Sequence, residues 1–482
     1  MTANFGRRRL GLKGNVLRET THFVGIGGAG MSSMARIMAS QGQRITGSDM
    51  RESSVLESLR RDFGIIATAG HDPANIDGAT LLVVSAAVRK DNPELVAARE
   101  RGIMIVTRSE MLGRLMDGYA RSIAISGTHG KTTTTGMIAT MLHHACMDPT
   151  VLIGGDLPAF GGNARLGQSD VFVAEACEAY DSFLDFHPKI AVITNIEADH
   201  LDYYGDLANV LRSFEKFMGQ VTEKLIVCGW DANIRTILES TEGLPPTVTY
   251  GLHSEVDLQA TEIEIEGLRP SYVAKLRGEA MGRVTLGVPG MHNVANSLSA
   301  ILVGLELGVP FPLIAAGLEK FTGTGRRFER LGTSDRDVLV VDDYAHHPTE
   351  IRATLSAARR AYPDRRLVAV FQPHLPSRTS DFKEQFAESF ADADQVFLTD
   401  IYLAREQPME GVTGAGLAAL TADRRGVAHV GYIQDMSAIP QRLDEFTRPG
   451  DVVVTLGAGD IRSVGEQFLK LSGMHGEVIN GS

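Results

Sequence analysis

The clearest chemical signal in the sequence is a phosphate-binding loop. An apolar stretch at residues 122–125 predicts a strand before the loop, and a helix is expected to begin at Lys131. Backbone amides at such a helix start can surround phosphates, Lys131 can reach the β and γ oxygens of a nucleotide, and the Thr132 hydroxyl can bind Mg²⁺. Ile125 stands where the usual P-loop has a glycine, so the motif is a G-x-x-G-K-T variant. The loop comprises Gly127, Thr128, His129, Gly130, Lys131, Thr132 and Thr133.

Phosphoryl transfer also needs metal ligands, which are expected at the carboxyl ends of neighbouring strands. Glu175 closes a predicted strand at residues 171–175, and His200 lies just past another at residues 190–194. With Thr132 they form the predicted Mg²⁺ site. The alternative is that His200 only caps a turn and that Glu178 or Asp199 takes its role at the metal site.

A second glycine-rich loop lies near the N-terminus. Gly25, Gly27, Gly28 and Gly30 fit G-x-G-x-x-G between a strand predicted at residues 22–26 and a helix predicted from residue 31. Asp49 follows 19 residues after Gly30. Alone, this pattern is typical of an NAD-dependent dehydrogenase. It also fits another diphosphate, such as that of a UDP-sugar, or a tight turn without a ligand.

Candidate ligand contacts recur in the last third of the chain. Arg327 lies on a glycine-rich linker and can clamp a phosphate, and Asp343 ends a strand, where an aspartate can accept hydrogen bonds from ribose hydroxyls. His346 and His347 are adjacent and point to different sides of an extended chain, which favours substrate contact over zinc. Arg378 is the natural partner for the carboxylate of a free amino acid.

These residues need α/β domains to position them. The chain has 482 residues, and strands alternate with helices, which predicts largely parallel sheets. Three units are expected at residues 1–120, 121–324 and 325–482, with antiparallel hairpins at 250–286 and a loose tail from residue 473. The outer two units are expected to be Rossmann-like. The net charge of −12 argues against a nucleic-acid partner, and the absence of a ~20-residue apolar run argues for a cytoplasmic location.

The order and spacing of these motifs resemble the Mur ligase family across essentially the whole chain. The alanine-adding members are the most similar. The matching segments are residues 25–31, 127–135, 174–178, 194–202, 292–296, 323–328, 342–350 and 371–374.

The resemblance implies an ATP- and Mg²⁺-dependent ligase that joins L-alanine to UDP-N-acetylmuramic acid. The N-terminal unit would hold UDP, the central unit would hold ATP, and closure of the C-terminal unit would bring the sites together. Asn293 and Asn296 would lie near the adenine. Arg327 would contact phosphate and Asp343 ribose. His346 and Arg378 would face the amino acid.

The chain departs from the family pattern at two places. Leu375 stands where some members have an arginine, so Arg378 would carry more of the amino-acid contact. Lys216 is the nearby candidate for a carbamylated metal ligand, and no role is assigned to it. A recycling ligase that adds a tripeptide, a dehydrogenase and a non-catalytic nucleotide-binding module remain as alternatives. Oligomeric state is not determined by the sequence.

Overall fold

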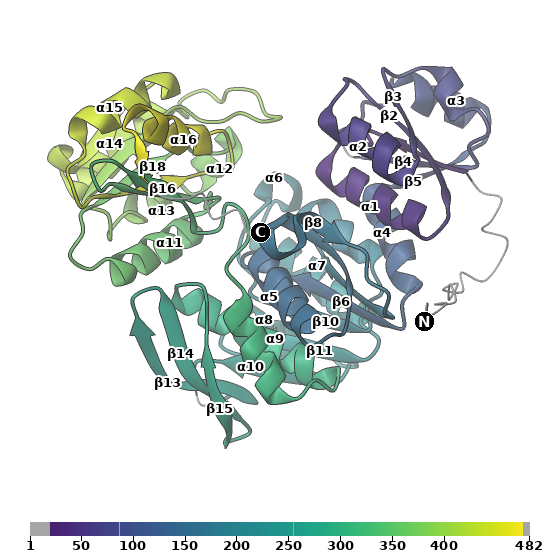
Figure 1. Ribbon diagram of the computed structural model, residues 1–482, viewed down its shortest axis with the longest axis horizontal. Coiled ribbons are helices and arrows are strands. Elements are labelled where there is room, and N and C mark those ends of the chain that lie inside the picture. Colours follow the sequence, from purple (N-terminus) through teal and green to yellow (C-terminus); the bar gives the residue numbers. More distant parts are fainter. Residues whose placement is uncertain (1–19, 86, 254, 476–482) are drawn as a thin grey trace, which may run out of the picture.

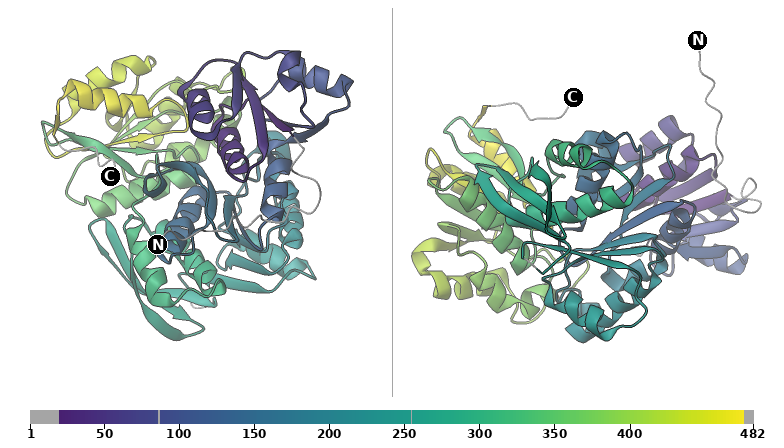
Figure 2. Two further views of the ribbon diagram at one scale, coloured as in Figure 1. Left: turned by 45° about the vertical axis from the view of Figure 1, so that its right-hand side comes forward. Right: turned by 90° about the horizontal axis from the view of Figure 1, so that it is seen from below.

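The computed structural model describes residues 20–85, 87–253 and 255–475, which form three α/β domains, each built on its own sheet. Figure 1 shows the central domain between the N-terminal domain, in purple, and the C-terminal domain, in green and yellow. The two further views in Figure 2 show the N-terminal and C-terminal domains each lying against the central domain. Within these ranges, no helix is long and apolar enough to cross a membrane.

The N-terminal domain has a parallel sheet with the order β3-β2-β1-β4-β5. From β1, the chain first adds strands on one side of the sheet (β2 and β3) and then on the other (β4 and β5). The glycine-rich loop that leads into α1 lies at this switch point. The strands are β1 (Thr20–Val24), β2 (Arg44–Asp49), β3 (Ile66–Ala69), β4 (Leu81–Val84) and β5 (Met104–Thr107). The helices are α1 (Ala29–Ser40), α2 (Ser54–Phe63), α3 (Pro93–Glu100) and α4 (Arg108–Asp117).

The central domain has a ten-stranded sheet with the order β15-β14-β13-β12-β11-β10-β6-β9-β7-β8. Its middle is parallel, whereas β13, β14 and β15 form the expected antiparallel hairpins. The strands are β6 (Arg121–Ser126), β7 (Thr150–Leu157), β8 (Gly162–Arg165), β9 (Val171–Glu175), β10 (Ile190–Ile193), β11 (Lys224–Cys228), β12 (Thr247–Gly251), β13 (Leu258–Glu266), β14 (Arg269–Leu276) and β15 (Glu279–Thr285). The helices are α5 (Lys131–His144), α6 (Leu201–Tyr204), α7 (Leu207–Gln220), α8 (Ala232–Ser240), α9 (Met291–Glu306) and α10 (Phe311–Lys320).

The C-terminal domain has the strand order β20-β19-β18-β21-β17-β16-β22. Apolar residues cover both faces of its parallel middle, so β18 is buried along its whole length. The strands are β16 (Glu329–Ser334), β17 (Leu339–Asp343), β18 (Leu367–Phe371), β19 (Gln395–Leu398), β20 (Val430–Tyr432), β21 (Val452–Leu456) and β22 (Met474–His475). The helices are α11 (Pro348–Ala361), α12 (Pro376–Asp381), α13 (Lys383–Glu388), α14 (Gly414–Arg425), α15 (Ile439–Phe446) and α16 (Arg462–Leu471).

The predicted three-domain α/β class is confirmed, although some element edges differ. The strand expected at residues 22–26 covers 20–24 instead, because the chain turns at Gly25, whose φ is +81°. The tail expected from residue 473 is in part a strand, since Met474 and His475 pair with β16. Residues 476–482 lie outside the described part of the chain.

Candidate active site

The phosphate-binding loop lies between β6 and α5, as its spacing predicts. Gly127 has a φ of +129°, and a Cβ there would lie 2.1 Å from Thr194 Oγ1, so the position requires glycine. Gly130, with a φ of +83°, is the N-cap of α5 and provides no side-chain cap. The first amide groups of α5 therefore have no capping side chain, which is what an anion site at a helix start needs.

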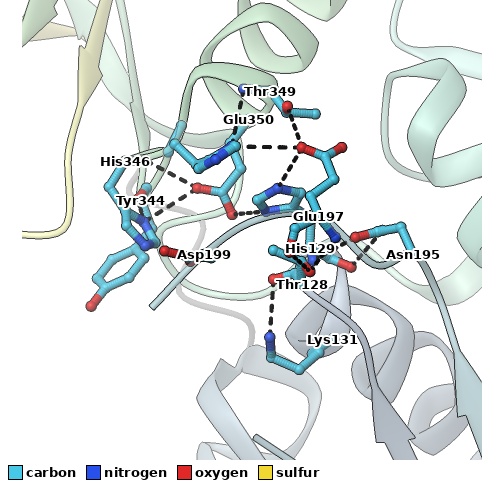
Figure 3. A network of polar contacts seen from close by, with 12 residues as sticks. Thr128, His129, Lys131, Asn195, Glu197, Asp199, Tyr344, His346, Thr349 and Glu350 are labelled. Carbon is cyan, nitrogen blue, oxygen red and sulfur yellow. Dashed lines mark hydrogen bonds and ion pairs between the residues drawn. The ribbon is translucent and has the colours of Figure 1, made fainter. Parts of the chain in front are cut away.

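The strand next to β6 fixes the shape of this loop. After β10, Asn195 accepts a hydrogen bond from the backbone N–H of His129 at 2.8 Å and donates one to its carbonyl at 3.0 Å. Thr194 Oγ1 donates to the same carbonyl at 2.6 Å. Figure 3 shows Asn195 holding His129 from one side. The loop is thus preorganised by bonds between neighbouring strand ends.

Lys131 and Glu178 form a buried ion pair. The Lys131 Nζ lies 2.8 Å from Glu178 Oε2 and donates to the Thr128 carbonyl at 3.0 Å. Burial lowers the pKa of Lys131, but the Glu178 carboxylate more than offsets this, and the pKa ends above its ordinary value. Lys131 is therefore a fixed positive charge folded over the loop. Glu178, named above only as an alternative to His200, is its counter-ion.

Thr132 and Glu175 come together as the predicted metal site requires. Thr132 Oγ1 donates to Glu175 Oε2 at 3.2 Å, while the Gly154 amide donates to Oε1 at 2.7 Å. Burial raises the pKa of Glu175. A hydroxyl beside a carboxylate is an oxygen donor set that suits Mg²⁺.

His200, the third predicted metal ligand, lies at the start of α6. It is the N-cap of α6, with a φ of +52°, and its Nε2 lies 3.8 Å from Asp199 Oδ2. Its Nδ1 is buried without a hydrogen-bond partner among the described residues. Within those residues, no hydrogen bond or ion pair joins His200 to Glu175 or Thr132, so its role as a ligand stays a prediction.

The asparagines expected near the nucleotide are buried on α9. Asn296 Nδ2 donates to Asn293 Oδ1 at 3.2 Å, and Asn293 Nδ2 donates to the Pro289 carbonyl at 2.7 Å. A Cβ on Gly130 would lie 2.9 Å from Asn296 Oδ1, so α9 packs directly against the phosphate loop. This places Asn296 beside the phosphate loop with Asn293 bonded behind it, while the contact of either side chain with adenine remains a prediction.

Asp343 faces the linker between the domains. Its carboxylate accepts backbone hydrogen bonds from Phe328 and Ala345, each at 2.8 Å. Burial raises the pKa of Asp343 to about 6. In this structure the carboxylate fixes the turn that carries Arg327, and ribose binding by Asp343 remains a prediction.

Glu350, on the first turn of α11, is the centre of a network that the sequence analysis did not identify. Its Oε1 lies 3.3 Å from His129 Nδ1 and 3.7 Å from Arg327 Nη1, and the His346 amide donates to its Oε2 at 3.0 Å. Figure 3 shows His129 lying between Glu350 and Glu197. Burial alone would raise the pKa of Glu350, but the positive charges of His129 and Arg327 hold it well below its usual range. The signal available in the sequence was the spacing of four residues between His346 and Glu350 at a helix start.

His129 is the cation of this network. Burial lowers its pKa, but the carboxylates of Glu197 and Glu350 override that effect and raise it to about 9. His129 thus links a loop of the central domain to α11 of the C-terminal domain.

The two adjacent histidines diverge, as expected. His346 Nδ1 lies 2.9 Å from the Tyr344 carbonyl, and burial lowers its pKa to about 3, so the ring is neutral. The ring of His347 faces the other way and lies 4.6 Å from that of His129 between centroids. His346 is therefore on the side of His374, with ring centroids 5.9 Å apart.

Arg378 is buried in an ion pair with Asp199 of the central domain. Its Nε and Nη2 lie 3.1 and 2.8 Å from Asp199 Oδ1, and its Nη1 lies 3.3 Å from His374 Nδ1. Burial would raise the pKa of Asp199, but Arg378 holds it far below its ordinary value. The guanidinium expected to bind a carboxylate is thus already paired with one from the protein itself.

The N-terminal glycine loop also has the predicted geometry. The Gly27 amide donates to Asp49 Oδ2 at 2.8 Å, and a Cβ on Gly27 would lie 2.8 Å from the same oxygen. Arg108, not identified from the sequence, lies over the loop, since a Cβ on Gly30 would be 3.0 Å from its Nη1. The start of α1 and this guanidinium together suit a diphosphate.

The sheets and sites described here define a member of the Mur ligase family. Models of its catalytic, middle and glutamate ligase domains match residues 20–120, 125–304 and 326–459, and the chain belongs to this family. The chain is 46% identical over 460 residues to a UDP-N-acetylmuramate–L-alanine ligase from Trichlorobacter lovleyi, with 95% of this chain and 99% of the relative covered. It is 47% identical to one from Geotalea uraniireducens, with 94% and 98% covered.

Solved structures agree with this assignment. A UDP-N-acetylmuramate–alanine ligase from Thermotoga maritima superposes with a TM-score of 0.77 at 29% identity, covering 94% of this chain and 98% of that one. A murein peptide ligase from Psychrobacter arcticus gives 0.67 at 25% identity, with 95% and 100% covered.

Proposed function

We propose that this chain catalyses the ATP-dependent joining of L-alanine to the lactyl carboxylate of UDP-N-acetylmuramate, in peptidoglycan precursor synthesis. The observation that carries the proposal is the preorganised phosphate loop with Lys131 at its centre, in a chain 46–47% identical to two L-alanine ligases over nearly its whole length. The UDP diphosphate would bind the Gly25–Gly30 loop with Asp49 and Arg108 nearby. The reaction would take place in the cytoplasm, where ATP is available.

The chemistry follows from the charges around the loop. A lactyl carboxylate oxygen attacks the γ-phosphorus, and the bond between this phosphorus and the β–γ bridging oxygen breaks. ADP departs as the leaving group, and the lactyl group becomes an acyl phosphate. Lys131 releases Glu178 and follows the transferred phosphoryl group, and Arg327 adds positive charge from the C-terminal domain. The neutral amine of alanine then attacks the acyl carbon, and inorganic phosphate leaves.

Mg²⁺ fits the residues present. Thr132 and Glu175 would hold it, and the unpartnered Nδ1 of His200 offers a further donor. When bound, Mg²⁺ would neutralise charge on the β and γ phosphates.

Alanine recognition rests on Arg378 and His346. Arg378 would exchange Asp199 for the alanine carboxylate, and His346 would contact the amino acid from the neighbouring loop. Leu375, whose φ is +69°, is buried and lines the same small pocket as Arg378 and Asp199. Because Leu375 has no charge, Arg378 would supply the positive charge for the alanine carboxylate.

The deciding experiment is an assay of ADP and phosphate release with ATP, Mg²⁺ and UDP-N-acetylmuramate, across single amino acids and the tripeptide. Turnover with L-alanine above every other amine supports the proposal. Turnover only with the tripeptide would make the chain a recycling ligase. No release with any amine would overturn the ligase assignment.

Lys131→Ala is expected to lower kcat for ADP formation by about 1,000-fold, because an oriented charge on the transferred phosphoryl group is lost. Lys216→Ala is the matched control, since Lys216 is exposed on α7. The control is expected to turn over normally. Loss of activity in Lys216→Ala, restored by a small carboxylate such as acetate that can replace the carbamate, would instead indicate a carbamylated lysine ligand.

A further inference from the structure

A cluster of metal-binding side chains lies between the central and C-terminal domains, outside the predicted Mg²⁺ site. His129 comes from the phosphate loop, Glu197 follows β10, and His347 precedes α11. One ligand atom from each of the three lies within 4.8 Å of the others. An ion about 2.0–2.1 Å from each ligand spans at most about 4.2 Å, so small side-chain rotations would bring all three ligands onto one ion.

We propose that His129, Glu197 and His347 form a transition-metal site, of the kind that takes Zn²⁺, and that the ion ties the central domain to the C-terminal domain. Ligands of Zn²⁺ lie about 2.0–2.1 Å from the ion, so two of them in a tetrahedron are about 3.4 Å apart. His129 Nε2 and Glu197 Oε2 are 3.5 Å apart. His347 Nδ1, which caps α11, is 3.9 Å from the same oxygen and leaves Nε2 of that ring as the free nitrogen. The proposal does not depend on the ligase activity.

Two buried ring nitrogens call for a partner here. The Nε2 atom of His347 is buried and has no hydrogen-bond partner among the described residues. His129 Nε2 also makes no hydrogen bond there and has only the Glu197 carboxylate at 3.5 Å. His347 is only 4% exposed. Buried polar atoms are normally satisfied, so an atom without a partner indicates a missing ligand.

The surroundings orient the three ligands as metal sites require. Glu350 Oε1 lies 3.3 Å from His129 Nδ1, and Thr349 Oγ1 donates to Glu197 Oε2 at 2.7 Å. Figure 3 shows both contacts. Such outer hydrogen bonds fix the tautomer of a histidine ligand and the direction of a carboxylate ligand.

The site also has an entrance and a chemical preference. Glu197 and His347 line a cavity of about 230 Å³, together with Asn233, Arg352 and Phe382. The cavity gives an ion access and leaves room for water as a fourth ligand. Two imidazoles and one carboxylate favour Zn²⁺, Co²⁺ or Fe²⁺, whereas Mg²⁺ prefers oxygen ligands. The site is therefore expected to bind its ion in the presence of excess Mg²⁺.

The test is a Co²⁺ titration of the full-length, chelator-treated protein in millimolar Mg²⁺, followed by visible absorption. We expect one equivalent of Co²⁺ to give the intense band of a tetrahedral ion and to raise the Tm. His347→Asn keeps an N-cap for α11 but removes a ligand, and is expected to weaken binding by on the order of 100-fold. His187→Asn, at an exposed histidine of the central domain, is the matched control and is expected to keep the band.

Glu197→Gln is the second variant and is expected to lose the band as well, while Glu175→Gln, at the predicted Mg²⁺ site, is expected to keep it. An unchanged Co²⁺ affinity in both His347→Asn and Glu197→Gln would overturn the proposal. So would the absence of a visible band in the wild-type protein, which would mean that the His129 ring is simply protonated between Glu197 and Glu350.

Discussion

The two junctions between the domains differ in the kind of contact that forms them. The N-terminal and central domains share one continuous apolar core, in which Tyr119 lies against Phe172 at 4.8 Å between ring centroids. The C-terminal domain has separate cores on the two faces of its own sheet. Its contacts with the central domain include the Asp199–Arg378 and His129–Glu350 pairs, and Ala198 and Leu201 pack against one of its cores.

This difference indicates which junction can open. Separating the first junction would expose apolar surface to water, at about 25 cal/mol per Å². The groups at the second junction can exchange their partners for a phosphate, a carboxylate or water. We therefore expect the C-terminal domain to move about the 323–325 linker during turnover, while the N-terminal and central domains move as one body.

The largest effect is expected at the buried Asp199–Arg378 pair. This pair lies in the junction between the central and C-terminal domains, which we call the polar junction; the junction between the N-terminal and central domains is the apolar junction. Arg378→Met leaves Asp199 as an uncompensated buried charge and is expected to cost about 3–5 kcal/mol in unfolding free energy. The double variant Arg378→Met/Asp199→Leu is expected to regain most of this stability, yet to stay about 100- to 1,000-fold low in kcat/KM for alanine. Denaturant unfolding and the ADP assay measure the two quantities. A double variant with normal alanine kinetics would show that Arg378 only joins the domains.

The next largest effect is a pH dependence of the unfolding free energy that arises at the polar junction. The pKa of His129 is raised to about 9 in the folded protein, against 6.5 in the unfolded chain. Its contribution of about 3 kcal/mol is fully present below pH 6.5 and is lost as the pH rises through 9. In metal-free buffer, the stability gap between wild type and His129→Gln is expected to close between pH 7 and pH 9.5. A gap of constant size would mean that His129 stays neutral.

The apolar junction is tested by Gly113→Ala. A Cβ at Gly113, on α4, would lie 2.1 Å from the Asp185 carbonyl oxygen of the central domain, so the backbones must separate. We expect a loss of about 1–3 kcal/mol in denaturant unfolding. Gly219→Ala on α7 is the matched control, because a Cβ there meets nothing within 4 Å. The control is expected to be neutral or to stabilise the protein by about 0.5–1 kcal/mol. Equal effects of the two substitutions would argue against a close junction at α4.

The sequence was informative where chemistry is local. The phosphate loop was predictable because strand, glycines, lysine and helix follow one another within a few residues. Glu350 was not, because its partner His129 lies 221 residues away, and neither residue alone predicts the contact. The Lys131–Glu178 pair, 47 residues apart, was missed for the same reason.

The fold shows the same division. The buried strand β9 was predicted with its observed bounds because it is a short apolar run in the middle of the sheet. The edge strand β8 (Gly162–Arg165) was not predicted, since a partly exposed strand has no distinctive apolar pattern. The edge strand β22 was not predicted either, because two residues are too few to form a pattern. Pairing across the chain, rather than local composition, determines such edges.

The smallest expected effect returns to the apolar junction. The Tyr119 hydroxyl donates to Thr150 Oγ1 at 3.1 Å and accepts from Gln41 Nε2 at 3.0 Å, so it links α1 to the central sheet. Tyr119→Phe keeps the ring on Phe172 and removes only these bonds, which predicts a loss of about 1 kcal/mol in unfolding free energy. Alanine turnover is expected to be unchanged, because the ring contact still holds the two domains together. If Tyr119→Phe instead lowered kcat while leaving stability unaltered, the N-terminal domain would have to move during the reaction, and the contrast between a fixed and a movable junction would fail.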